Sequence, residues 1–118
     1  MRHLCQKHKI GVDSKHQKSL LRNLASAVIT HGKIKTTHTK CLATRRFLEK
    51  LVTIARQDTL ANRRLVLAKL DNKDAVKVLF KDVAPKFADR KGGYTRIIKL
   101  ADPRVGDSAR VSILSFVE

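Results

Sequence analysis

Apolar residues recur at helical spacing over several stretches after residue 13, and the spacing changes to alternation near the end of the chain. Between Ser14 and Gly32, leucines and smaller apolar residues fall on one side at 3.6-residue spacing. This pattern predicts a helix that Ser14 caps and Gly32 ends. From about Thr39 to Gln57, a broader apolar face predicts a second helix that is buried against more than one neighbour.

Shorter elements are predicted between and after these two helices along the chain. β-branched residues over Lys33–Thr37 predict a short strand between them. Two further short helices are expected after the second one. Thr59 would cap the first, which ends near Ala68, and Asp71 would cap the second, which Pro85 stops.

The last third of the chain is typical of strands. Two runs with period two, Tyr94–Leu100 and Arg110–Val117, are separated by a loop and predict an antiparallel pair. Because helices come first and strands last, residues 14–118 are expected to form one α+β domain. We predict a two-layer α/β arrangement, with about four helices packed on a small mixed three-stranded sheet. Residues 1–13 are basic and weakly periodic, and we expect an extended N-terminal arm there.

The charge of the chain indicates its class of partner. Among 118 residues there are 26 Lys and Arg against 10 Asp and Glu, which gives a net charge of +16. Residues 1–50 alone hold 12 Lys and Arg against 2 acidic residues, a net charge of +10. With 42% hydrophobic residues the chain can still build a packed core. The composition therefore predicts a folded domain with a polyanionic partner, and nucleic acid is the partner that we expect.

Several other classes of protein are disfavoured by the sequence. Cys5 and Cys41 are too few for a disulfide framework, which favours a reducing, cytoplasmic setting. No apolar run is long enough to cross a bilayer, and we expect no membrane partner. Aromatic residues make up only 4% of the chain, and Phe47, Phe80 and Phe116 are all assigned to apolar faces. Binding is therefore expected to run through phosphate and shape rather than base stacking, on structured RNA or on DNA.

Candidate catalytic and metal-binding patterns are weak. His3, Cys5 and His8 could in principle hold zinc, but their spacing fits no standard finger. The acidic residues are scattered rather than clustered as a metal-dependent nuclease requires. There is no P-loop, G-x-S-x-G or G-x-G-x-x-G motif. We therefore expect no metal, no cofactor, no small-molecule substrate and no enzymatic activity.

The most informative segment runs from Asp89 to Arg96. Its paired glycines, Gly92 and Gly93, and its cations could form a phosphate grip, or the glycines could simply permit a turn with Tyr94 in the core. Two other basic groups carry similar alternatives. Lys15, Lys18 and Arg22 could contact phosphate or form a solvated helix face. Arg63 and Arg64 diverge by about 100° on a helix, so one could face a ligand while the other pairs with an acid.

These residues resemble a known family over nearly the whole chain. The matching blocks are Met1-Arg2-His3, Arg22-Asn23-Leu24-Ala25, His31–Thr37, Lys50–Ala55, Arg63-Arg64, Leu79-Phe80, Ala84-Pro85, Asp89-Arg90 and above all Gly92-Gly93-Tyr94-Thr95-Arg96-Ile97. They are similar to the bacterial-type ribosomal large-subunit protein seventeen. The resemblance implies an α/β body with a basic N-terminal extension, bound to large-subunit rRNA near the outlet of the peptide tunnel, beside neighbouring ribosomal proteins. It also places Arg2, His3, Lys15, His16 and Lys18 on rRNA.

The sequence therefore predicts an rRNA-binding structural constituent of the large ribosomal subunit, in the cytoplasm or, less favoured, in an organelle. A free-standing architectural or regulatory nucleic-acid-binding protein is the alternative. The expected RNA contacts are Arg2, His3, Lys7, Lys9, Lys15, His16, Lys18, Arg22, Lys33, Lys35, Lys40, Arg46, Arg63, Arg64, Arg90, Lys91, Gly92, Gly93, Tyr94 and Arg96.

Overall fold

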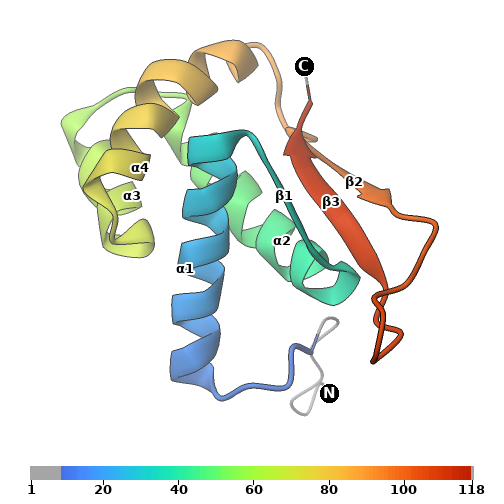
Figure 1. Ribbon diagram of the computed structural model, residues 1–118. Coiled ribbons are helices and arrows are strands. Elements are labelled where there is room, and N and C mark those ends of the chain that lie inside the picture. The colour runs from blue at the N-terminus through green and yellow to red at the C-terminus, as the bar shows by residue number, and fades with distance from the viewer. Residues whose placement is uncertain (1–8, 118) are drawn as a thin grey trace, which may run out of the picture.

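The computed structural model describes residues 9–117 as helices covering one face of a small sheet (Figure 1). The expectations for residues 1–8, including Arg2, His3, Lys7 and the possible zinc ligands Cys5 and His8, lie outside the described residues. The α+β class is confirmed. The described elements are α1 (Ser14–His31), β1 (Lys33–Thr37), α2 (His38–Ala55), α3 (Leu60–Leu70), α4 (Lys73–Val78), a π-helical turn η1 (Leu79–Val83), a 3₁₀ turn η2 (Ala84–Phe87), β2 (Thr95–Lys99) and β3 (Val111–Phe116).

The helix ends follow local side-chain chemistry, in two cases one residue away from the prediction. The cap of α1 is Asp13, not Ser14, because Asp13 has the extended backbone of a cap and its carboxylate accepts from His16 N at 2.7 Å. Likewise Asn72, not Asp71, caps α4 through Ala75 N at 3.1 Å. Asp71 instead ends α3 in the left-handed region, at φ 54°.

Gly32 and Thr59 behave as predicted. Gly32 ends α1 with φ 84°, and the Thr59 hydroxyl caps α3 by accepting from Asn62 N. Pro85 does not stop the helical chain. It occupies the first turn of η2, where its missing N–H has no partner to lose, and the chain continues to wind until Phe87.

The three strands form one sheet in the order β1-β3-β2. The predicted pairing of the two last strands is confirmed, but the sheet is antiparallel throughout rather than mixed, because β1 also pairs antiparallel with β3. Side chains therefore alternate between two faces. Ile34, Leu114 and Ile97 lie side by side on the face that packs against the core, whereas the next row along, Lys33, Ser115 and Arg96, lies on the opposite face.

Helix α2 is the centre of the core. Its residues Leu48, Leu51 and Val52 are completely buried, and the helix contacts all three strands as well as α1 and α3. This confirms the broad apolar face predicted for it. Burying each such side chain stabilises the fold by roughly 1.5–3 kcal/mol before entropy is counted. This packing fixes the orientation of α2 relative to the sheet.

Candidate nucleic-acid interface

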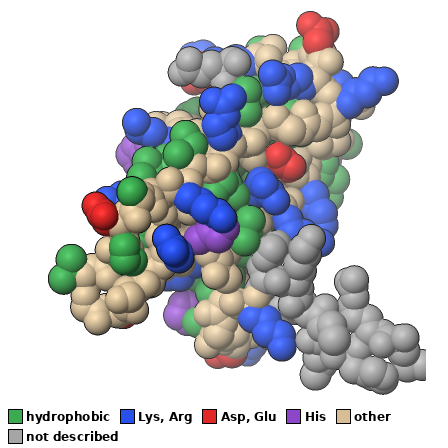
Figure 2. All heavy atoms as spheres, turned by 90° about the vertical axis from the view of Figure 1, so that its right-hand side faces the viewer, with side chains coloured by type: hydrophobic (Ala, Val, Ile, Leu, Met, Phe, Trp, Pro, Cys, Tyr) green, Lys and Arg blue, Asp and Glu red, His purple; other side chains and the backbone are tan. Residues whose placement is uncertain are grey.

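Most of the positive charge in the described part of the chain has no carboxylate partner. Among residues 9–117 only two ion pairs form, Arg63 with Asp58 at 2.6 Å and Arg104 with Asp107. On the side of the molecule that carries the sheet, Lys and Arg side chains are spread over the surface and acidic ones are few (Figure 2). A polyanion approaching this surface would meet little competition from internal ion pairs.

Several of these cations line a shallow hollow of about 590 Å³. We call it the α2 hollow. Four exposed cations line it: Arg46 and Lys50 from α2, Lys69 from α3, and Lys91 from the loop before β2. The one carboxylate at its wall, Glu49, accepts a hydrogen bond from the Thr95 hydroxyl at 2.9 Å. The remaining lining residues are Thr53, Ile54, Gly92 and Tyr94.

The Gly-Gly turn beside this hollow is held in place by its neighbours. Gly93 takes a positive φ of 63°, and Arg90 donates from Nη1 to the Gly93 carbonyl oxygen at 3.1 Å. Tyr94 is fully buried, with its ring centroid 5.4 Å from that of Phe87. Its hydroxyl accepts from the Thr53 hydroxyl at 3.2 Å and donates to the Arg90 carbonyl oxygen at 3.4 Å. The structure confirms the alternative of a glycine-permitted turn with Tyr94 in the core, and it places Lys91 at the hollow. The phosphate grip stays a prediction.

A second group of cations lies on the outer face of the sheet. Lys33 and Arg96 flank Ser115 in one row across the three strands, and Lys35 lies in the next outward row. All three cations are exposed, and none forms an ion pair among the described residues. Neighbouring strands are about 4.8 Å apart, so the backbones that carry Lys33 and Arg96 are roughly 10 Å apart. One sugar-phosphate strand can reach both.

The predicted basic face of α1 is divided. Lys15, His16 and Lys18 are exposed near the start of the helix, whereas Arg22 is half-buried. Arg22 donates from Nε to the Lys69 carbonyl oxygen at 2.9 Å, which ties α1 to the end of α3. Lys9 is exposed just before α1, and Lys40 is half-buried in the first turn of α2.

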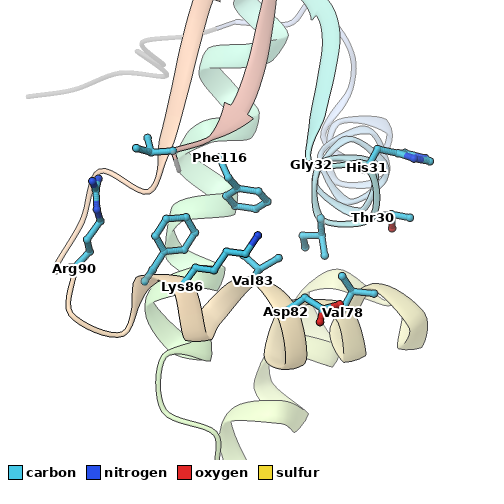
Figure 3. Close-up of a pocket in the computed structure, with 12 residues that line it drawn as sticks. Thr30, His31, Gly32, Val78, Asp82, Val83, Lys86, Arg90 and Phe116 are labelled. Carbon is cyan, nitrogen blue, oxygen red and sulfur yellow. The ribbon is translucent and has the colours of Figure 1, made fainter.

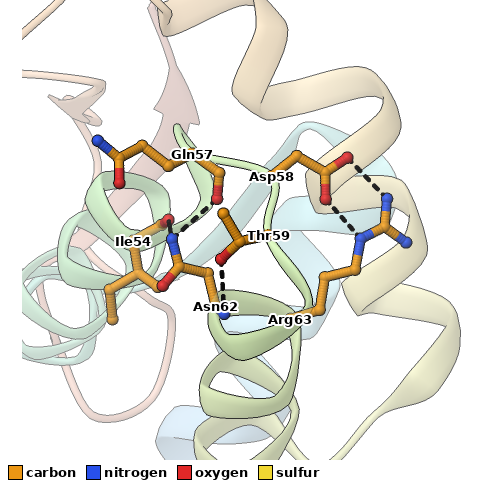
Figure 4. A network of polar contacts seen from close by, with 6 residues as sticks. All are labelled: Ile54, Gln57, Asp58, Thr59, Asn62 and Arg63. Atoms are coloured by element: carbon orange, nitrogen blue, oxygen red, sulfur yellow. Dashed lines mark hydrogen bonds and ion pairs between the residues drawn. The ribbon is translucent and has the colours of Figure 1, made fainter.

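Arg63 and Arg64 separate as their spacing suggested. Arg63 donates from Nε and Nη2 to the two carboxylate oxygens of Asp58 at 2.6 and 2.8 Å (Figure 4). The same guanidinium lies 5.1 Å from the centre of the Phe80 ring. Hydrogen bonding to Arg63 lowers the pKa of Asp58. Arg64 is exposed and is the one that can face a ligand.

His38, Cys41 and Ser112 form a cluster of reactive side chains at the start of α2. His38 Nδ1 lies 2.7 Å from Ser112 Oγ, and the Cys41 thiol donates to the Ser112 carbonyl oxygen at 3.5 Å. Ser112 and Cys41 are completely buried, and burial raises the pKa of the Cys41 thiol. Since a substrate cannot reach either group, the cluster ties β3 to α2. Within residues 9–117, no group of three His, Cys, Asp or Glu side chains is placed to hold a metal ion.

Comparison with known proteins agrees with the earlier resemblance. The family model for ribosomal protein L17 matches residues 20–117. The large ribosomal subunit protein bL17 of Methylacidiphilum infernorum (isolate V4) is 44% identical over 118 residues, which is all of this chain and 89% of that protein. The chain belongs to the ribosomal protein L17 family. The resemblance stated from the sequence blocks is confirmed.

Two cations of the α2 hollow, Lys50 and Lys69, were not among the RNA contacts expected from the sequence. Lys50 lies one helical turn after Arg46, so a search for cations at i and i+4 would have found it. Lys69 is distant in sequence from both, and only the packing of α3 brings it to the hollow.

No helix in the described range is both long and apolar enough to span a membrane.

Proposed function

We propose that this protein is a structural constituent of the large subunit of a bacterial-type ribosome and binds large-subunit rRNA through phosphate and shape contacts. The observation that carries the proposal is the α2 hollow, where four exposed cations without carboxylate partners converge. Family membership supplies the ribosomal setting, since the bL17 relative is by name a protein of the large ribosomal subunit.

The finer parts of the proposal are what the resemblance to the family implies. We place the protein near the outlet of the peptide tunnel, beside neighbouring ribosomal proteins, and assign it no catalytic step. The contacts proposed for rRNA are exposed side chains of three groups: Lys15, His16 and Lys18 on α1; Lys33, Lys35 and Arg96 on the sheet; and Arg46, Lys50, Lys69 and Lys91 at the α2 hollow.

Two measurements test this function. Sedimentation of cell extracts should place the protein with assembled large subunits, whereas a pool that sediments with DNA would support the free-standing architectural alternative. Purified protein should bind structured RNA with a steep salt dependence, because each neutralised phosphate adds about 0.7 to 0.9 to the slope of log affinity against log salt. A nearly flat salt response would contradict phosphate binding.

A further inference from the structure

A pocket of about 770 Å³ opens at the end of α1, between the last turn of that helix, the turns η1 and η2, and the end of β3 (Figure 3). We call it the α1-end pocket. Ile29, Val83, Phe87 and Phe116 supply its apolar wall. The rings of Phe87 and Phe116 are 5.8 Å apart between centroids, and Phe116 is only half-buried. The volume of the α1-end pocket lies in the range of sites that hold small organic groups.

Polar groups of both kinds surround this apolar wall. Figure 3 shows the Phe116 ring between Lys86 on one side and the end of α1 at Thr30 on the other. Lys86 and Arg90 supply donors, and Asp82 supplies an acceptor. In the described part of the chain, no backbone N–H donates to the carbonyl oxygens of Ile29, Thr30 or His31 in the last turn of α1. An aromatic surface is thus bordered by hydrogen-bond donors and acceptors.

The α1-end pocket lies next to the cation pair at the end of the sheet. Its residues His31, Gly32 and Phe116 also line an adjoining hollow of about 440 Å³, whose other walls are Lys33, Arg96 and Ser115. The aromatic pocket and the two cations therefore share a wall. A ligand that combines a flat ring with a neighbouring phosphate matches both parts at once.

We propose that the α1-end pocket binds one unstacked base of an RNA strand, with the base against Phe116 and its flanking phosphates on Lys33 and Arg96. This inference rests on the proposed function and goes beyond it, because phosphate and shape contacts alone need no base pocket. An apolar side chain of a neighbouring protein could pack against the apolar wall of the pocket, but it would leave Asp82, Lys86 and the cation pair without partners. A base can contact Asp82 and Lys86 while its flanking phosphates contact the cation pair.

The test compares two RNA hairpins that differ only by one bulged nucleotide, each bound to the full-length protein and followed by fluorescence anisotropy. The bulged hairpin should bind roughly tenfold more tightly, since stacking of one base on an aromatic side chain has about that effect. Phe116→Leu keeps an apolar side chain but removes the aromatic face, so it should abolish this preference and leave binding of the paired hairpin unchanged.

A second pair of variants tests the pocket independently, in case Phe116→Leu does not fold. Lys86→Ala should reduce the preference for the bulged hairpin, whereas its matched control Lys81→Ala should not, because Lys81 is exposed on the neighbouring turn and does not line the pocket. Melting temperatures of all variants would be measured in parallel.

Each outcome is decisive. Equal, salt-dependent affinity for the two hairpins would overturn the base pocket and leave the proposed function standing. Absence of binding to both hairpins would overturn the two together. A photoreactive phenylalanine analogue in place of Thr30, which lines the pocket, should crosslink to rRNA in assembled large subunits. A crosslink to another protein would instead assign the pocket to a protein partner and overturn the inference.

Discussion

The Arg22 side chain donates from Nε to the backbone carbonyl oxygen of Lys69, 2.9 Å away and 47 residues later in the chain. The bond satisfies a carbonyl in the last turn of α3 and places a positive charge at the negative end of that helix. Because Lys69 also lines the α2 hollow, the bond from Arg22 helps to hold one of the residues of the hollow in place.

Arg22→Ala should therefore destabilise the fold by about 1 kcal/mol, because the α3 carbonyl loses its donor. Thermal unfolding followed by circular dichroism would show the lower melting temperature. Lys18→Ala is the matched control on the same helix, and it should leave the melting temperature unchanged because Lys18 is exposed. The structural role of Arg22 would be contradicted if Arg22→Ala melts like the wild type and only weakens RNA binding.

Gly93 provides a second test of local structure. It has φ 63°, whereas its neighbour Gly92 is not in the left-handed region, and a Cβ atom at either position would meet nothing within 4 Å. Any difference between Gly93→Ala and Gly92→Ala thus reports backbone strain alone. Gly93→Ala should cost roughly 1–2 kcal/mol and Gly92→Ala much less, as measured by urea unfolding. Equal effects would show that the turn does not require a glycine at position 93.

The turn and the outer sheet face should respond differently to mutation. Arg96 forms no ion pair among the described residues, so Arg96→Ala should leave the melting temperature nearly unchanged. It should lower the slope of log RNA affinity against log salt by about 0.7 to 0.9, which is one phosphate contact. If Arg96→Ala instead destabilises the fold and retains RNA affinity, Arg96 has a structural role.

The α2 hollow can be tested by removing its cations one at a time. Arg46→Ala, Lys50→Ala and Lys69→Ala should each weaken binding to structured RNA and reduce the salt slope by about one phosphate contact. Lys77→Ala serves as the control, because Lys77 is exposed on α4 outside the hollow. Equal losses for all four variants would mean that only the net charge matters and not the site.

The loop between β2 and β3 gives a prediction about pH. The Arg104 guanidinium, and then the Ala109 N–H, lower the pKa of Asp107 from near 3.8 to about 2. Because the folded-state pKa is the lower one, the contact stabilises the fold above about pH 4 and its contribution is lost as the pH falls towards 2. Both groups are exposed, so added salt should weaken the effect.

Carboxyl NMR shifts followed during an acid titration would measure the pKa of Asp107 directly. Arg104→Ala should return it towards the ordinary value, whereas Arg110→Ala, in the same loop region without a bond to Asp107, should leave it near 2. An unchanged pKa in Arg104→Ala would assign the shift to the backbone instead.

The sequence by itself determined the order and type of the elements. Gly32, Thr59 and the two alternating runs act through their own backbone preferences and nearest neighbours, and the structure follows all of them. Where the prediction was one residue off, at Asp13 and Asn72, several adjacent residues could cap equally well and the final packing selected one. The net positive charge and the resemblance to the ribosomal protein family were likewise evident from the sequence alone.

Only the tertiary structure decided which cations lie together. Lys69 lines the same hollow as Arg46 and Lys91 because α3 packs against α2. Arg22 does not join the exposed basic residues of α1, because it donates to a carbonyl oxygen 47 residues away. Phe116 was assigned to the core from its position in a strand, yet its place at the end of that strand leaves the ring at the mouth of a pocket. Local pattern reports what each residue prefers, but a site consists of side chains brought together across long separations, and the packing of the hydrophobic core fixes those distances.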